Sequence, residues 1–146
     1  MSKYDFDLVV LGAGPGGYIA ANRASQLGKK VAIIERERLG GVCLNKGCIP
    51  TKALLKAAHS VHQIKDFKSM GINVEVKSLD AAQAVRRATG VSDRISKGVE
   101  FLMKKNKVEV IKGTAKLIDP HAMSVALATG EDRKVSYDKL VLATGA

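Results

Sequence analysis

An apolar run at the start of the chain ends directly in a glycine-rich turn. Residues 5–11 (DFDLVVL) precede residues 12–17 (GAGPGG), and this pattern predicts a buried parallel strand, a turn and the opening of a helix. Gly12 permits the tight turn, Gly14 lets the backbone approach a pyrophosphate, and Gly17 lets the helix pack closely on the strand. The beginning of the chain therefore predicts a βα unit suited to a nucleotide.

A second apolar run, residues 31–34 (VAII), ends in Glu35, and Gly28 is placed to end the helix between the two runs. Glu35 follows Gly12 at close to the spacing of ~20 residues expected for the acid that holds a ribose hydroxyl. A carboxylate there repels a 2′-phosphate, which favours an unphosphorylated adenosine ribose. The alternative is that Glu35 only caps the end of a strand. The ribose role is favoured because the strand, turn, helix, second strand and acid follow one another in the order that this motif requires.

Two later helices are predicted from apolar residues at helical spacing. The first follows Lys52, continues to about Ile64, and has an inward face made of Ala53, Leu54, Ala57, Ala58, Val61 and Ile64. The second begins at Leu79 or Asp80 and presents a narrow stripe made of Val85, Ala88, Ser92, Ile95, Val99 and Leu102. We expect this long helix to lie on its own domain; a coiled-coil partner surface is the alternative.

Short alternating runs predict the remaining strands. They are a short strand at 71–76, a third parallel strand at 108–111, an antiparallel meander at 113–118, 123–128 and 134–137, and a fourth buried strand at 139–143 that stops in Thr144-Gly145. The predicted fold class is therefore α/β, with a Rossmann-like parallel sheet, flanking helices and a small antiparallel meander.

Composition sets the broad class of the protein. A chain of 146 residues with 46% hydrophobic and 26% charged residues predicts one folded domain. No run approaches the ~20 apolar residues of a membrane span, and the first residues lack the apolar core of a signal peptide. We expect a cytoplasmic protein without a membrane partner.

The net charge of +10 raises the question of nucleic-acid binding. The basic residues are dispersed among Asp and Glu, and aromatic residues make up only 4% of the chain, so no stacking platform accompanies the charge. The charge is better explained as a solvated basic surface, and we expect no nucleic-acid partner.

The segment GGVCLNKGCIPTK (residues 40–52) holds both cysteines, Cys43 and Cys48. In a regular helix their spacing gives ~7.5 Å of rise and ~140° of rotation, which places the Cα atoms roughly 8–9 Å apart, whereas a disulfide tolerates about 4.4–6.8 Å. If the two pair, the backbone must leave ideal helix, and Gly47 supplies that freedom. Pro50 fits best in the first turn of the following helix.

Metal binding is the main alternative for the two cysteines. Structural zinc takes four ligands, and the other candidates are His59, His62 and His121. The gap between the cysteines is at the wide edge of zinc spacing, so redox chemistry is favoured and the histidines are predicted to be surface residues. The glycine motif serves both FAD and NAD. A dithiol cannot pass a hydride directly to nicotinamide, so redox chemistry at the cysteines favours the flavin dinucleotide, FAD. No metal is expected.

Residues 40–55 (GGVCLNKGCIPTKALL), with GAGPGG and Glu35, closely resemble the pyridine-nucleotide disulfide oxidoreductases. Leu44 and the triplet 48–50 (CIP) resemble the members that oxidise dihydrolipoamide; the similar glutathione and mercuric reductases usually carry Val in these places. The resemblance implies FAD bound by Gly12, Gly14, Pro15, Gly17, Glu35, Arg36, Gly40, Gly41, Val42, Cys43, Lys52, Ala115, Ala143, Thr144 and Gly145. It places Lys52 near the flavin ring; a solvated surface lysine is the alternative.

For the intact enzyme the resemblance implies a relay. Dihydrolipoamide attacks Cys43, Cys48 is released as a thiolate beside the flavin, and electrons pass to FAD and then as hydride to NAD. The pKa of that thiolate is expected to be lowered by its surroundings, because the thiolate is the reacting form. The implied partners are lipoamide on the lipoyl domain of an acyltransferase, within a 2-oxoacid dehydrogenase complex, and a second subunit in a homodimer.

Residues 1–146 are expected to form the amino-terminal portion of an FAD-binding domain. The NAD-binding domain, and the dimerisation domain with its catalytic His-Glu pair, have no counterpart in this sequence, so we expect the polypeptide alone to be inactive. The alternatives are another disulfide reductase of the family, of the glutathione or mercuric type, or a flavin-binding module without turnover.

Overall fold

A computed structural model describes residues 3–145; the first two residues of the predicted amino-terminal stretch and Ala146 lie outside the described residues. The elements are β1 (Phe6–Leu11), α1 (Pro15–Gln26), β2 (Val31–Glu35), α2 (Gly41–Asn45), α3 (Cys48–Phe67), the short 3₁₀ helix η1 (Lys68–Met70), α4 (Ala81–Lys105), β3 (Glu109–Asp119), β4 (Ala122–Leu127) and β5 (Asp132–Leu142). The prediction of a mixed α/β fold is confirmed.

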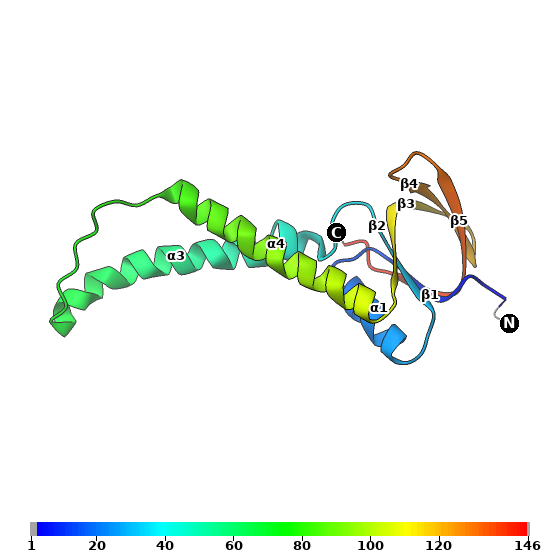
Figure 1. Cartoon of the computed structure of the whole chain (residues 1–146), viewed down its shortest axis with the longest axis horizontal. Helices are drawn as coiled ribbons and strands as arrows, with labels where there is room; N and C mark the ends of the chain where they lie inside the picture. Colours follow the sequence, from blue (N-terminus) through cyan, green and yellow to red (C-terminus); the bar gives the residue numbers. More distant parts are fainter. Residues whose placement is uncertain (1–2, 146) are drawn as a thin grey trace.

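The five strands close into one hydrogen-bonded ring. Strand β1 pairs in parallel with β2 and with β5, and β2 pairs in parallel with β3. Strand β4 pairs antiparallel with both β3 and β5. The ring closes because β3 and β5 are long: one end of each belongs to the parallel ladders, and the other end pairs with β4 (Figure 1).

The predicted antiparallel meander is confirmed by the pairing of β4 with β3 and with β5, but it is continuous with the parallel strands and not separate from them. The runs 108–111 and 113–118 form one strand, β3, and the runs 134–137 and 139–143 belong to one strand, β5. Gly113 does not end β3. A Cβ atom there would lie 2.4 Å from the backbone oxygen of Ala126, so the glycine allows a close approach between β3 and β4.

The predicted glycine turn between β1 and α1 is confirmed in detail. Gly12 has a φ of +98°, and a Cβ atom at Gly17 would lie 1.9 Å from the Gly12 oxygen. Helix α1 therefore packs on the turn at a distance that only glycine permits. Gly28, with a φ of +81°, follows the C-cap residue Leu27 and ends α1 as expected.

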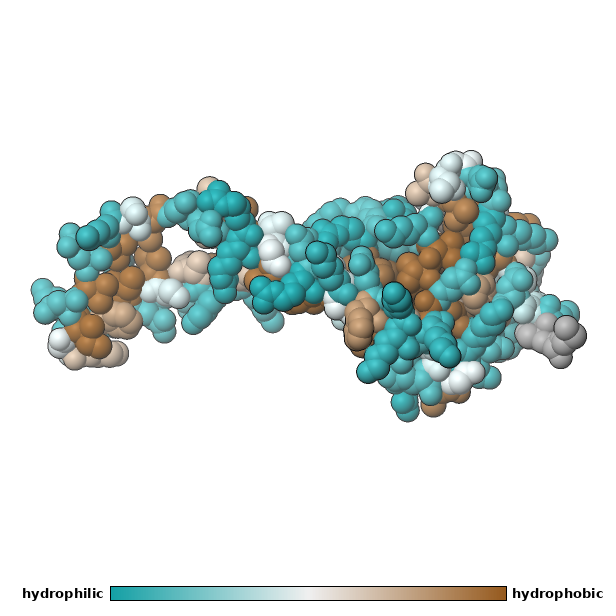
Figure 2. Space-filling view, in the orientation of Figure 1, coloured by the Kyte–Doolittle hydropathy of each residue, from teal (hydrophilic) through white to brown (hydrophobic). Residues whose placement is uncertain are grey.

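Helices α3 and α4 contact each other and extend from the strand ring as an arm (Figure 1). Residues 71–80 connect them at the far end without strand or helix, so the predicted strand at 71–76 is wrong. No other strand runs beside this segment in the described chain. Figure 2 shows apolar surface toward this end of the arm, where Met70, Ile72, Val74, Val76 and Leu79 are exposed.

The predicted inward face of α3 is also corrected. None of its residues is buried, and Leu54 and Val61 are 40% and 37% exposed. In the described chain, its main helical neighbours are α4 and the short helix α2. Apolar periodicity gave the helix correctly, but α3 lies in the arm rather than over the sheet. No described helix is both long and apolar enough to cross a membrane.

Helix α4 begins where predicted, because Asp80 is its N-cap and accepts a hydrogen bond of 2.8 Å from the Gln83 N–H. Its buried face is made of Ala88, Ser92, Ser96, Val99 and Met103. The predicted stripe was therefore right at three positions and wrong at Val85, Ile95 and Leu102, which are exposed. Of the two serines on this buried face, Ser96 makes hydrogen bonds to Leu39 and Asn45.

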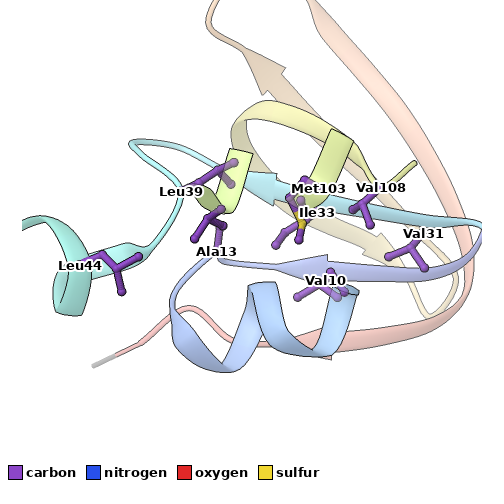
Figure 3. Close-up of a cluster of buried hydrophobic side chains, with 10 residues drawn as sticks. Val10, Ala13, Val31, Ile33, Leu39, Leu44, Met103 and Val108 are labelled. Carbon is purple, nitrogen blue, oxygen red and sulfur yellow. The ribbon is translucent and has the colours of Figure 1, made fainter. Parts of the chain in front are cut away.

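Two apolar clusters hold the ring together. One lies between the parallel strands and the helices and includes Val10, Ile33 and Met103 (Figure 3). The other lies on the opposite face of the same strands and includes Val9 and Ile34. Consecutive residues of β1 and β2 are thus buried on both faces, which explains their unbroken apolar runs.

Candidate functional site

A cavity of about 470 Å³ opens at the carboxyl ends of β1, β2 and β5. Its lining comes from the glycine turn, the loop after β2, helix α2 and the end of the chain: Gly12, Ala13, Gly14, Pro15, Glu35, Arg36, Glu37, Arg38, Gly41, Val42, Cys43, Asn45, Lys46, Ala143, Thr144 and Gly145. The backbone fixes these segments, since the Ala143 N–H donates to the Leu11 oxygen and the Gly40 N–H donates to the Ala13 oxygen, each at 2.8 Å.

Glycines shape the floor of this cavity. A Cβ atom at Gly41 would lie 2.6 Å from the Cα of Gly14, so the α2 turn rests directly on the glycine turn. At Gly14 the space where a Cβ atom would sit is open for 4 Å. Gly14 is the N-cap of α1, whose unpaired N–H groups favour an anion. The floor therefore offers backbone contact to a flat or phosphorylated ligand without side-chain obstruction.

Glu35 is held at the wall of the cavity by the backbone. Its Oε2 accepts the Ala13 N–H and its Oε1 accepts the Glu37 N–H, both at 2.8 Å. The side chain thus reaches from the end of β2 to the glycine turn, beyond the role of a simple strand cap. A carboxylate with free lone pairs in this position can accept hydrogen bonds from a diol such as ribose.

A second, adjoining cavity of about 190 Å³ is lined by the carboxyl ends of β1 and β2 and by the middle of β3. It shares Gly12, Glu35, Arg36 and Thr144 with the first and adds Leu11, Ile34, Gly113, Thr114 and Ala115. The joint space has one glycine-lined, cation-rimmed part and one smaller part beside Glu35. That arrangement suits an extended ligand with a diphosphate and a ring system.

Three cations stand at the rim of the larger cavity. Arg38 pairs with Asp93 of α4 at 2.8 Å, and Lys46 pairs with Glu37 at 2.6 Å. The Lys46 ammonium lowers the pKa of the Glu37 carboxyl by hydrogen bonding and charge. Arg36 has no ion pair among the described residues, so its guanidinium is available to an anionic ligand.

The two cysteines flank a break in the helix, as their spacing predicted. Helix α2 ends at Asn45, Lys46 and Gly47 leave helical geometry, and Cys48 opens α3 with Pro50 in its first turn. A Cβ atom at Gly47 would lie 3.1 Å from the Val42 oxygen. Both cysteines are free thiols; Cys43 is half-buried and lines the cavity, whereas Cys48 is exposed.

The Cys48 thiol changes the acidity of Cys43. Hydrogen bonding to Cys48, and then burial, raise the pKa of Cys43, while the charge of Lys52 acts in the opposite direction. In the dithiol state Cys43 is therefore a weaker acid than an isolated thiol. It must lose its own proton before it becomes a good nucleophile.

The structure brings most of the predicted site residues together. Those that line the larger cavity are Gly12, Gly14, Pro15, Glu35, Arg36, Gly41, Val42, Cys43, Ala143, Thr144 and Gly145, and Ala115 lines the smaller one. Four lie outside both linings. Gly17 and Gly40 shape turns, Cys48 is the exposed partner of Cys43, and Lys52 is an exposed residue of α3.

Sequence reasoning missed Glu37, Arg38, Asn45 and Lys46, which also line the cavity. Their charge alternation after Glu35 and their position beside the cysteines were the available signals. His59, His62 and His121 are exposed, as predicted. Among the residues that the structure describes, no group of three or more His, Cys, Asp or Glu gathers in a way that could hold a metal ion.

The fold and the site define an α/β domain in which a glycine-floored, cation-rimmed cavity adjoins a dithiol. The family model for pyridine nucleotide-disulphide oxidoreductases matches residues 6–146. The chain therefore belongs to the pyridine nucleotide-disulphide oxidoreductase family.

Curated relatives refine this assignment. The chain is 47% identical to a dihydrolipoyl dehydrogenase of Chlorobaculum parvum over 145 residues, which cover 99% of this chain and 31% of that protein. It is 45% identical over 141 residues to a dihydrolipoyl dehydrogenase of Zymomonas mobilis, covering 97% and 30%, and 55% identical over 117 residues to one of Rhizobium etli, covering 79% and 24%. The chain spans about 30% of the length of the first two.

Proposed function

We propose that this chain is a Rossmann-like FAD-binding unit carrying a redox-active cysteine pair. The observation that carries the proposal is the joint cavity: a glycine floor with open space at Gly14, the backbone-held carboxylate of Glu35 at its wall and Cys43 in its lining. The residues present fit a dinucleotide.

Each part of the cavity has a role in the proposal. The N-terminus of α1, with Gly14 and Pro15, would face the pyrophosphate. Glu35 would accept hydrogen bonds from the adenosine ribose, and its charge would exclude a 2′-phosphate. Arg36 lines both cavities, and Ala115 and Thr144 line the smaller one, which would take the adenine.

The cysteine pair passes on the electrons of the substrate in this scheme. In the oxidised chain a substrate thiolate attacks Cys43 of the Cys43–Cys48 disulfide, so the S–S bond breaks, a mixed disulfide forms and Cys48 leaves as a thiolate. The second substrate thiol then closes the substrate disulfide and releases Cys43, which leaves the chain as the dithiol. FAD, when bound, supplies an acceptor for the electron pair of that dithiol, and the charge of Lys52 favours the thiolate of Cys43. The resemblance alone assigns Cys43 to the substrate and Cys48 to the flavin side, whereas in the dithiol structure Cys43 lines the cavity and Cys48 is exposed.

For the whole protein we propose oxidation of dihydrolipoamide with NAD as the final acceptor. Support comes from the shared name of relatives at 45–55% identity. The proposed partners follow from that activity: a lipoyl group on an acyltransferase domain and a second subunit in a homodimer. Another disulfide reductase of the family is the alternative substrate assignment. A flavin-binding module without turnover is the alternative for residues 1–146 alone.

The test is a titration of the purified 146-residue chain with FAD, followed by flavin fluorescence and the visible spectrum, with a thiol count before and after oxidation. We expect saturable binding of one FAD and loss of two titratable thiols. Glu35→Gln should weaken FAD binding about 10-fold or more, because a hydrogen bond to a charged acceptor is lost. Glu131→Gln, at an exposed turn, is the matched control and should bind as the wild type does. Absence of binding would contradict the proposal.

A further inference from the structure

Helix α2 carries Cys43 but has little of its own to hold it in place. It is only five residues long, and no side chain caps its amino end. Asn45, its last residue, supplies the missing support: the Asn45 Nδ2 donates to the Gly41 oxygen at 2.9 Å and to the Leu39 oxygen at 3.1 Å. One amide group thus ties the end of the turn to its start.

The amide of Asn45 is in turn held from the long helix α4. The Ser96 Oγ lies 2.8 Å from Asn45 Oδ1 and 3.1 Å from the Leu39 oxygen. Ser96 is 1% exposed, so water does not compete for these contacts. By donating its proton to Asn45 Oδ1, Ser96 fixes the orientation of the amide, whose NH₂ group then faces the two backbone oxygens.

We propose that Ser96 is a positioning residue for the Cys43–Cys48 pair, acting through Asn45 and the α2 turn. The inference rests on the proposed redox function. Ser96 lies outside both cavities and contacts neither cysteine by hydrogen bond, so its effect is on geometry alone.

The consequence follows from the narrow geometry of a disulfide. Cys43 sits two residues before Asn45 on the same short turn, and Cys48 lies near enough to raise the pKa of its thiol. A turn that loses its amide anchor samples more positions, and the fraction of time in which the sulfurs can bond falls. Loss of the Ser96 hydroxyl should therefore make the disulfide harder to form.

Helix α4 offers a matched control one turn earlier. Ser92 is 3% exposed, and its hydroxyl has no hydrogen-bond partner in the described part of the chain. Ser92→Ala removes the same atoms from the same buried face without touching Asn45. We expect it to leave the cysteine equilibrium unchanged, because an unpaired buried hydroxyl is not needed there.

The experiment is a redox titration of the 146-residue chain in mixtures of reduced and oxidised dithiothreitol. In this exchange the cyclic disulfide of the reagent breaks, the Cys43–Cys48 bond forms, and two electrons and two protons pass from the protein thiols to the reagent. Ser96→Ala should lower the equilibrium constant for protein disulfide formation about 10-fold, equal to about 30 mV for a two-electron couple. Ser96→Thr, which keeps the hydroxyl, should stay within about twofold of the wild type.

Each outcome is decisive. If Ser96→Ala matches the wild type, or if Ser92→Ala shifts the equilibrium equally, the proposal is overturned. Ser96→Val replaces the alanine variant if that variant does not fold. If neither folds while Ser96→Thr does, the hydroxyl is a requirement of the fold and the positioning role is refuted. If the wild type forms no intramolecular disulfide, the proposed redox function fails instead.

Discussion

Cys43 lies in the α2 turn and lines the cavity, and its partner Cys48 opens helix α3. The pKa of Cys43 is raised chiefly by the hydrogen bond with the Cys48 thiol, then by burial, and Lys52 counteracts this only in part. The dithiol form is therefore less reactive at Cys43 than two separate thiols would be. Removing one thiol should change the reactivity of the other in a direction that the structure fixes.

Cys48→Ala should lower the pKa of Cys43, because the thiol that stabilises its protonated form is gone while the backbone N–H of residue 48 remains. Alkylation of Cys43 by iodoacetamide at pH 7.5 should be about two- to fivefold faster than in the wild type, since the gain in thiolate is partly offset by lower intrinsic nucleophilicity. The measurement is the alkylation rate against pH from 6 to 10, with the modified peptide identified by mass spectrometry.

Lys52→Met in the same background is the control for this prediction. It removes the only charged side chain that lowers the pKa of Cys43, so the profile of alkylation rate against pH should move back toward higher pH. The pH midpoint of the alkylation rate reports the pKa of Cys43. If this midpoint in Cys48→Ala is equal to or higher than in the wild type, the Cys48 thiol does not raise the pKa of Cys43 and the prediction is wrong.

Single residues also show where sequence reasoning works. Glu35 was predicted from its spacing to Gly12 because both ends of that distance lie in one local βαβ unit. Ser96 was not predicted, since its partner Asn45 is 51 positions away in the chain. Its one signal was a second serine one turn after Ser92 on a face expected to be apolar.

At the scale of elements, α4 contains two glycines that the fold does not require. A Cβ atom at Gly98 would meet nothing within 4 Å, and its φ lies in the ordinary negative range. Gly98→Ala should therefore stabilise the chain by about 0.5–1 kcal/mol, because alanine has the higher helix propensity and restricts the unfolded chain. Urea unfolding followed by far-UV circular dichroism measures the difference.

Gly28→Ala is the matched control, because it too has open space around the new Cβ atom but has a φ of +81°. Only the backbone conformation differs, so this variant should destabilise the chain by about 1 kcal/mol. The same sign for both variants would show that backbone conformation does not decide the effect.

The elements that could be predicted are those whose partners are near in sequence or whose burial repeats regularly. The strands β1 and β2 and the helices α1, α3 and α4 were found from local patterns, whereas the short α2 and η1 were not predicted. The joining of runs into β3 and β5 was missed, because the ring that requires long strands is set by pairing between distant segments. The exposed face of α3 was missed because periodicity reports an apolar side but not what covers it.

At the scale of the whole molecule, two halves of the chain together form the strand ring. The first half, through α3, supplies β1 and β2; the second, from α4 onward, supplies β3, β4 and β5. The halves meet in two parallel ladders, β1 with β5 and β2 with β3, and in the cluster that joins Val10 and Ile33 to Val99 and Met103. The covalent link between them, residues 71–80, contributes no strand or helix to the ring.

Limited trypsin digestion should therefore cut this link first, because every residue of 71–80 is exposed and a protease needs an accessible, extended backbone. Lys77, within the link, is the expected first site. The nicked protein should show two bands on a denaturing gel but elute as one species near the size of the uncut chain, since the ladders and the core remain. Lys77→Gln should slow the first cut, whereas Lys134→Gln, within the paired strand β5, should not. Halves that separate in native buffer, or a first cut inside the strand ring, would show that the ring is not held as these contacts require.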